Sequence, residues 1–119
     1  MFVYLLCADT GVQNVAHQVV VDIMSSEQCH AMGPAYSPWL TDNMVCVRYA
    51  ETDPNVCYTL SGSALVCRQA DRWWQHGFVS WGASGCVNAT QPEVHSSVAR
   101  YLPWIEQNTI GQFLYIYCM

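Results

Sequence analysis

The sequence has no lysine and only four arginines, against nine acidic residues and a net charge of −5. Charged residues make up 11% of the 119 residues, whereas about a quarter is usual. This shortage of positive charge argues against nucleic-acid binding, which depends on lysine and arginine contacts with phosphates. The hydrophobic content of 52% excludes a disordered chain. The length suits one domain of modest size, or one half of a two-lobed protein.

Long apolar runs are also absent. The apolar ends, Met1–Leu6 and Phe113–Met119, are much shorter than the roughly 20 residues of a membrane-spanning helix. The first of them also lacks the basic start of a signal peptide. The sequence therefore predicts no membrane partner.

The seven cysteines include no C-x-x-C pair, so they lack the close ligand spacing typical of zinc sites. They lie at positions 7, 29, 46, 57, 67, 86 and 118. This pattern favours a disulfide framework and a secreted protein, with no metal and no cofactor. Because no export signal accompanies the cysteines, we expect either a fragment of a longer protein or a start that is not the native one.

Short stretches rich in β-branched residues predict strands. They lie at 17–23, 44–48, 64–68, 77–81 and 94–98. Loops are expected at 31–37, 51–55 and 82–92, and a connection holding Asp71, Arg72, Trp73 and Trp74 is expected between the third and fourth strands. These short strands predict an all-β barrel.

Two helical segments are also predicted. Ser25 or Ser26 is a candidate N-cap for a helical turn over 26–30. The segment 99–108 has helical spacing of Tyr101, Leu102 and Ile105, with Trp104 adding bulk to that face and Pro103 placed near the first turn. The expected architecture is thus a barrel closed by a C-terminal helix.

Two motifs carry a family resemblance. The run from Cys57 to Cys67 is CYTLSGSALVC, and the run from Gly77 to Cys86 is GFVSWGASGC. In this order and spacing, followed by Pro92 and the segment RYLPWIEQ, they resemble the C-terminal barrel of chymotrypsin/trypsin-like (S1) serine proteases. The resemblance covers about residues 7–109. It implies a six-stranded antiparallel β-barrel, the C-terminal half of the two-barrel fold, over residues 1–109, with residues 110–119 outside the family pattern.

The resemblance also implies a disulfide pairing. Its bridges are Cys7–Cys67, Cys29–Cys46 and Cys57–Cys86. Cys118 is then the odd cysteine, either tail-linked or free.

Ser61 falls on the family's nucleophile position, with Thr59 and Ser61 at the oxyanion-hole positions. The family's catalytic histidine and aspartate lie in an N-terminal barrel that this sequence does not contain, and a serine needs both partners to be nucleophilic. Thr59 replaces a family glycine and Leu60 replaces a family aspartate. We therefore expect a non-catalytic homologue in which Ser61 is an ordinary loop serine. The alternative is a fragment of an active serine endopeptidase whose histidine and aspartate lie in the missing barrel.

The pocket positions differ from the family as well. Asn55 lies where trypsin-like members carry an aspartate, and Glu93 where they carry a pocket-lining glycine. Glu93 either plugs the pocket or gives it a negative charge. Ser80, Trp81 and Gly82 match the family segment that pairs with a bound peptide strand. The resemblance thus implies a peptide or protein ligand at these substrate-binding positions, and the missing N-terminal barrel as a further partner.

Four histidines and one asparagine complete the candidates. The histidines are expected to be surface or hydrogen-bonded residues rather than bases, and they are His17, His30, His76 and His95. His95 falls at a pocket-wall position where the family usually has tyrosine. The triplet Asn88-Ala89-Thr90 is a glycosylation sequon in a predicted loop.

Overall fold

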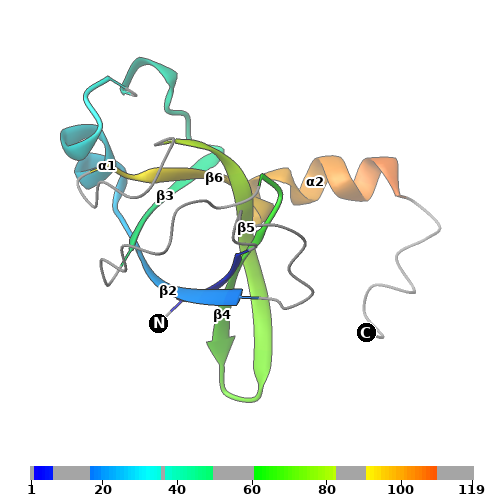
Figure 1. Ribbon diagram of the computed structural model, residues 1–119. Helices are drawn as coiled ribbons and strands as arrows, with labels where there is room; N and C mark the ends of the chain where they lie inside the picture. Colours follow the sequence, from blue (N-terminus) through cyan, green and yellow to red (C-terminus); the bar gives the residue numbers. More distant parts are fainter. Residues whose placement is uncertain (1, 7–16, 36, 50–60, 83–90, 110–119) are drawn as a thin grey trace.

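A computed structural model describes residues 2–6, 17–35, 37–49, 61–82 and 91–109. Six antiparallel strands form a closed barrel in the order β1-β2-β3-β6-β5-β4 (Figure 1). The strands are β1 (Phe2–Leu6), β2 (His17–Ile23), β3 (Met44–Tyr49), β4 (Ala64–Gln69), β5 (Arg72–Gly82) and β6 (Glu93–Ser97). This confirms the predicted six-stranded antiparallel barrel followed by a C-terminal helix.

The barrel interior is filled by branched aliphatic side chains from different strands. Val21, Val47 and Leu65 are fully buried, and Val79 joins them from β5. β-Branched residues suit this role because their stiff side chains pack well on a pleated surface. Burial of these side chains inside the barrel thus explains why the segments at 17–23, 44–48 and 64–68 form strands.

A second buried cluster joins the barrel to helix α1 (Ser26–Met32). Cys29 on α1 is bonded to Cys46 on β3, with their Cα atoms 6.0 Å apart. Both cysteines are buried with Met24 and Val94. The disulfide implied by the family resemblance for this pair is therefore present.

Helix α1 begins as the sequence predicts, at a serine cap. The Ser25 hydroxyl accepts a hydrogen bond from the Gln28 N–H (3.1 Å), and the Gln28 side-chain oxygen accepts one from the Ser25 N–H (3.0 Å). This capping box satisfies two backbone donors at the helix start. The helix runs further than predicted, since Ala31 and Met32 belong to it, and the expected loop is shortened again by a 3₁₀ turn, η1 (Ser37–Trp39).

The connection between β4 and β5 is much tighter than predicted. It consists of Ala70 and Asp71, with Ala70 at a positive φ of 53°. Arg72, Trp73 and Trp74 belong to β5 rather than to a loop. A two-residue turn lets both strands continue pairing to their ends, and tryptophan is itself favoured in strands.

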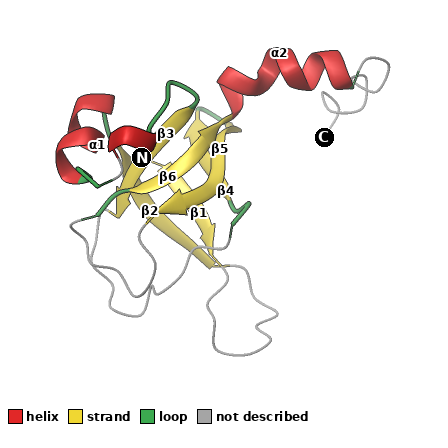
Figure 2. Ribbon diagram, turned by 90° about the horizontal axis from the view of Figure 1, so that it is seen from above, coloured by secondary structure: helices red, strands yellow, loops and turns green. Residues whose placement is uncertain are grey.

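Helix α2 (Val98–Asn108) contacts the barrel at β5 and extends away from it (Figure 2). None of its residues is buried, so the predicted apolar face stays largely exposed, with Trp104 63% exposed. Pro103 lies inside the helix rather than in its first turn. Because proline has no N–H, the Ala99 carbonyl receives no hydrogen bond from residue 103.

A cavity of about 410 Å³ lies beside α2, lined by Phe78, Ser96, Tyr101, Trp104 and Ile105. No helix within the described ranges is long and apolar enough to cross a membrane.

Candidate functional site

The predicted nucleophile position lies in a turn that is held by its backbone. Ser61 and Gly62 are exposed, and only Ser63 separates them from β4. The Gly62 N–H donates to the Val79 carbonyl (2.9 Å), and the Val79 N–H donates to the Ser63 carbonyl (2.9 Å). Gly62 has a φ of +89°, a conformation that side chains with a Cβ rarely adopt. The turn is therefore fixed against β5, with the Ser61 side chain on the surface.

Within the described residues, no histidine or carboxylate is hydrogen-bonded to Ser61. A serine hydroxyl without such a partner is a poor nucleophile. The part of the chain that the structure describes thus places a serine at the family position without a base.

Strand β5 changes its pairing beside this turn. Val79 is in register with His95, but the next paired residue is Trp81, opposite Val94, so Ser80 is an extra residue in a β-bulge. Ser80 is exposed, whereas Trp81 and Gly82 are partly buried. Bulges are frequent next to functional sites because they redirect a strand.

One edge of this segment is open in the described part of the chain. Pairing with β6 continues to Gly82, which lies opposite Glu93, but pairing with β4 ends at Phe78. The edge of residues 80–82 that faces away from β6 is therefore not covered by β4. A strand edge that its neighbouring strand leaves uncovered is able to bind an extended peptide through backbone hydrogen bonds.

The wall of the barrel beside Gly82 contains a buried polar cluster. Glu93, the first residue of β6, is 8% exposed, and His95 is fully buried. His95 Nε2–H donates to Glu93 Oε1 (2.8 Å), and the Tyr49 hydroxyl donates to Glu93 Oε2 (3.1 Å). Both carboxylate oxygens thus have a donor from this chain, which is what burial of a carboxylate requires.

Strand geometry explains how the three side chains meet. Glu93 and His95 are two residues apart on β6, so their side chains lie on the same face. β6 pairs with β3, with Val47 opposite Glu93, and Tyr49 follows Val47 by the same two-residue step. We call Tyr49, Glu93 and His95 the wall cluster.

The sequence identified two members of the wall cluster and missed the third. Glu93 was predicted as a pocket residue, and His95 was predicted as a hydrogen-bonded or surface histidine; the structure shows it buried and hydrogen-bonded. Tyr49 was not singled out. The available signal was the alternation Val45, Val47, Tyr49, which predicts a tyrosine on the inner face whose hydroxyl needs a buried partner.

Several predicted site residues lie outside the described residues. They are Asn55, Thr59, Leu60 and Asn88, together with the Cys57–Cys86 bridge and Cys118.

The predicted Cys7–Cys67 bridge has one of its two cysteines, Cys67, among the described residues. Cys67 carries a free, partly buried thiol, and its register partner on β1 is Phe2. Cys7 follows the end of β1 and lies outside the described residues.

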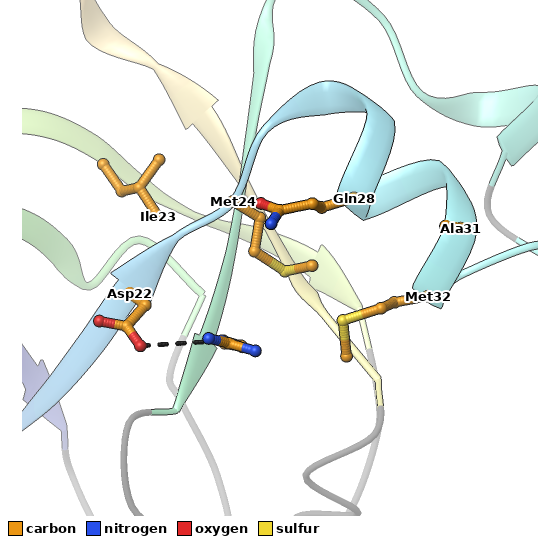
Figure 3. Close-up of a pocket in the computed structure, with 7 residues that line it drawn as sticks. Asp22, Ile23, Met24, Gln28, Ala31 and Met32 are labelled. Carbon is orange, nitrogen blue, oxygen red and sulfur yellow. Dashed lines mark ion pairs between the residues drawn. The ribbon is translucent and has the colours of Figure 1, made fainter.

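A cavity larger than the one beside α2 lies between the end of β2, α1 and β3 (Figure 3). Its volume is about 560 Å³, and it is lined by Asp22, Ile23, Met24, Gln28, Ala31, Met32 and Arg48. Asp22 and Arg48 form an ion pair at 3.7 Å, with both side chains about half exposed. The lining holds no serine, cysteine or histidine, and the described residues contain no group of metal-ligating side chains. We assign no chemistry to this cavity.

Comparison with known proteins identifies the family of this chain. Bovine coagulation factor XI is 34% identical over 100 residues, which is 84% of this chain and 16% of that protein. Human transmembrane protease serine 5 is 36% identical over 101 residues, which is 85% of this chain and 22% of that protein. The chain thus spans less than a quarter of either relative. A family model described as Trypsin matches residues 7–105. The chain therefore belongs to the trypsin family of serine-protease domains.

Proposed function

We propose that this chain binds an extended peptide without cleaving it. The observation that carries the proposal is the wall cluster, in which Glu93 is held by Tyr49 and His95 beside Gly82. In the family resemblance, the Glu93 position lines the pocket for a substrate side chain. A carboxylate that is already bound by two of the chain's own donors acts as a plug rather than as a free recognition group.

The lack of cleavage follows from the surroundings of Ser61. The histidine that is in register with Val79, next to the Ser61 turn, is His95, and its Nε2 is engaged with Glu93. Thr59 and Leu60 replace the glycine and aspartate of the family motif. One misdirected oxyanion donor alone lowers kcat by about 10²–10³, and within the described residues Ser61 is bonded to neither a base nor a carboxylate.

Peptide binding is supported by the open edge of residues 80–82. A ligand strand added there would be held mainly by backbone hydrogen bonds, so the site would favour an extended backbone over any particular deep side chain. Trp81 adds a partly buried aromatic surface beside the strand. We further propose that the chain works outside the cell, where the Cys29–Cys46 disulfide is stable.

The second candidate is a piece of an active serine endopeptidase. It is favoured by Ser61 and Gly62, which keep the family spacing in a turn held by two backbone hydrogen bonds. It is favoured also by the similarity to the human relative, which is named as a transmembrane protease. In this case an N-terminal barrel of a longer parent would supply the histidine and the aspartate, and it would cover the exposed face of α2.

Two measurements on the oxidised full chain test the proposal. Binding of a fluorescently labelled tetra-alanine peptide is followed by anisotropy, and reaction with a fluorophosphonate is followed by mass spectrometry. We expect saturable binding and no covalent adduct. Binding should be lost in Ser80→Pro, which places a rigid proline ring in the strand that carries the open edge, and kept in the matched control Ser80→Ala.

Each measurement can overturn one part of the proposal, either the lack of cleavage or the binding of a peptide. An adduct at Ser61 that disappears in Ser61→Ala favours the endopeptidase. The absence of saturable binding, or equal binding by Ser80→Pro and Ser80→Ala in variants with the parent's circular dichroism spectrum, removes the peptide site.

A further inference from the structure

The hairpin made by β4 and β5 extends beyond the barrel (Figure 1). β1 pairs with β4 only at Leu65–Cys67, and β6 pairs with β5 only from Gly77 onward. Residues 68–69 and 72–75 therefore form a two-stranded ribbon with no further partner among the described strands. Such an unpaired edge presents N–H and C=O groups to any strand that approaches.

Two tryptophans of β5 lie on this ribbon. Trp73 is 54% exposed and Trp74 is 51% exposed. As neighbours on one strand they lie on opposite faces of the ribbon. Arg72 shares a face with Trp74, and Arg68 lies directly opposite Trp73.

The ribbon also concentrates positive charge. Arg68 and Arg72 are two of the four arginines of a chain with a net charge of −5. In the described part of the chain, neither one belongs to an ion pair. The same short edge thus carries exposed cations and exposed aromatic rings, which are attracted to each other.

We infer that the outer edge of β5, residues 72–75, is an interface for a second copy of this chain. The two β5 edges would pair antiparallel across a two-fold axis and form one four-stranded sheet. In such a pair the residue at the axis lies opposite its own copy, and residues opposite each other share a face.

The side chains select one register of this pair. With Trp73 at the axis, the two Trp73 rings are opposite each other, and Arg72 lies opposite Trp74 of the second copy on the other face. Aromatic pairs and cation–π pairs across strands are both stabilising. A register centred on Arg72 would oppose two guanidinium groups, and one centred on Trp74 would place Arg72 opposite His76.

A second copy of this chain suits the outer edge of β5 better than a membrane surface does. The turn at the tip of the hairpin contains Asp71, an exposed residue that anionic lipids would repel. A two-fold interface needs complementary groups on the same edge, and Arg72 and Trp74 provide them. Because the edge is only a few residues long, well below a standard interface of about 1,600 Å², we expect a weak and reversible dimer.

Sedimentation equilibrium of the oxidised full chain over a range of concentrations tests the inference. We expect a monomer–dimer equilibrium whose dissociation constant rises several-fold in Trp73→Lys and in Arg72→Glu. Each variant has a matched control on another surface. Trp39→Lys removes a tryptophan that is 70% exposed on η1, Trp104→Lys removes one that is 63% exposed on α2, and Arg100→Glu makes the same charge change on α2.

Three results would overturn the interface. One is a chain that stays monomeric at every concentration. Another is association that Trp104→Lys weakens as much as Trp73→Lys does, which would place the contact on α2. The third is an equal effect of Arg100→Glu and Arg72→Glu, which would indicate general charge repulsion.

Discussion

The Ser61 turn and the wall cluster lie on either side of β5, and they differ in what their side chains do. The turn keeps the family's serine and glycine, but Ser61 is exposed and only the backbone fixes the segment. The wall cluster departs from the family at Glu93 and His95, yet its side chains are buried and bonded to one another. In this chain the residues at the predicted pocket positions, rather than the serine at the predicted nucleophile position, are the ones whose side chains are integrated into the fold.

This contrast has an energetic consequence. A buried hydrogen-bonded carboxylate contributes to stability through every donor that it satisfies, whereas an exposed serine contributes little. Substitutions in the wall cluster should therefore lower the free energy of unfolding much more than substitutions in the turn.

The largest effect is expected for Glu93→Ala. It removes the acceptor of His95 and of the Tyr49 hydroxyl inside the barrel. Leaving a buried donor without its acceptor costs about 1–3 kcal/mol for each donor, and urea unfolding of the oxidised chain measures the loss. Glu106→Ala, an exposed glutamate on α2, is the control and should change stability little.

The double variant Glu93→Gly/His95→Tyr sharpens this result. It restores the residues that the family has at both positions and removes the buried charge together with its partner. We expect it to be more stable than Glu93→Ala, because replacing both partners of a pair is better tolerated than removing one. A loss below about 1 kcal/mol in Glu93→Ala would show that the wall cluster does not stabilise the barrel.

The disulfide behind the wall cluster should come next. Cys46 is in register with Val94, between the two β6 members of the cluster, and the bridge to Cys29 spans 17 residues. Opening a loop of this length costs about 3 kcal/mol, so Cys29→Ser/Cys46→Ser should unfold at clearly lower urea concentration. Cys67→Ser is the control, since the Cys67 thiol is free, and a comparable loss there would indicate that Cys67 is bridged after all.

Much of the barrel could be predicted from the sequence because its signals are local. β-Branched segments predicted β2, β3 and β4, and a serine cap predicted the start of α1. The Cys29–Cys46 pair came from the family resemblance, since spacing alone allows many pairings. In each case a few neighbouring residues or one motif carry the information.

The errors arise where distant pairing decides the structure. β1 has an apolar sequence without alternation, and it becomes a strand because β2 and β4 pair with its two edges. β5 begins at Arg72 because β4 offers it a partner to the end of the hairpin. The wall cluster likewise joins residues from β3 and β6, which are 44 positions apart at Tyr49 and Glu93.

On the turn side, Gly62→Ala should have a smaller effect. A Cβ on Gly62 would meet no atom within 4 Å, so its cost is the positive φ alone, about 1–2 kcal/mol. Gly62→Asn should cost less, because asparagine tolerates left-handed backbone better. Equal losses for both variants in urea unfolding would show that the turn is sensitive to side-chain size rather than to backbone conformation.

The smallest effect is expected for Ser61→Ala. Ser61 is exposed, and the described part of the chain contains no hydrogen bond from its hydroxyl, so the change should lie within about 0.5 kcal/mol. The same substitution should leave tetra-alanine binding unchanged, because the proposed site uses the edge of residues 80–82. A loss of more than about 1 kcal/mol, comparable to a missing buried hydrogen bond, would mean that Ser61 has a structural partner. The turn would then resemble the wall cluster in depending on its side chains, and the contrast between the two regions would fail.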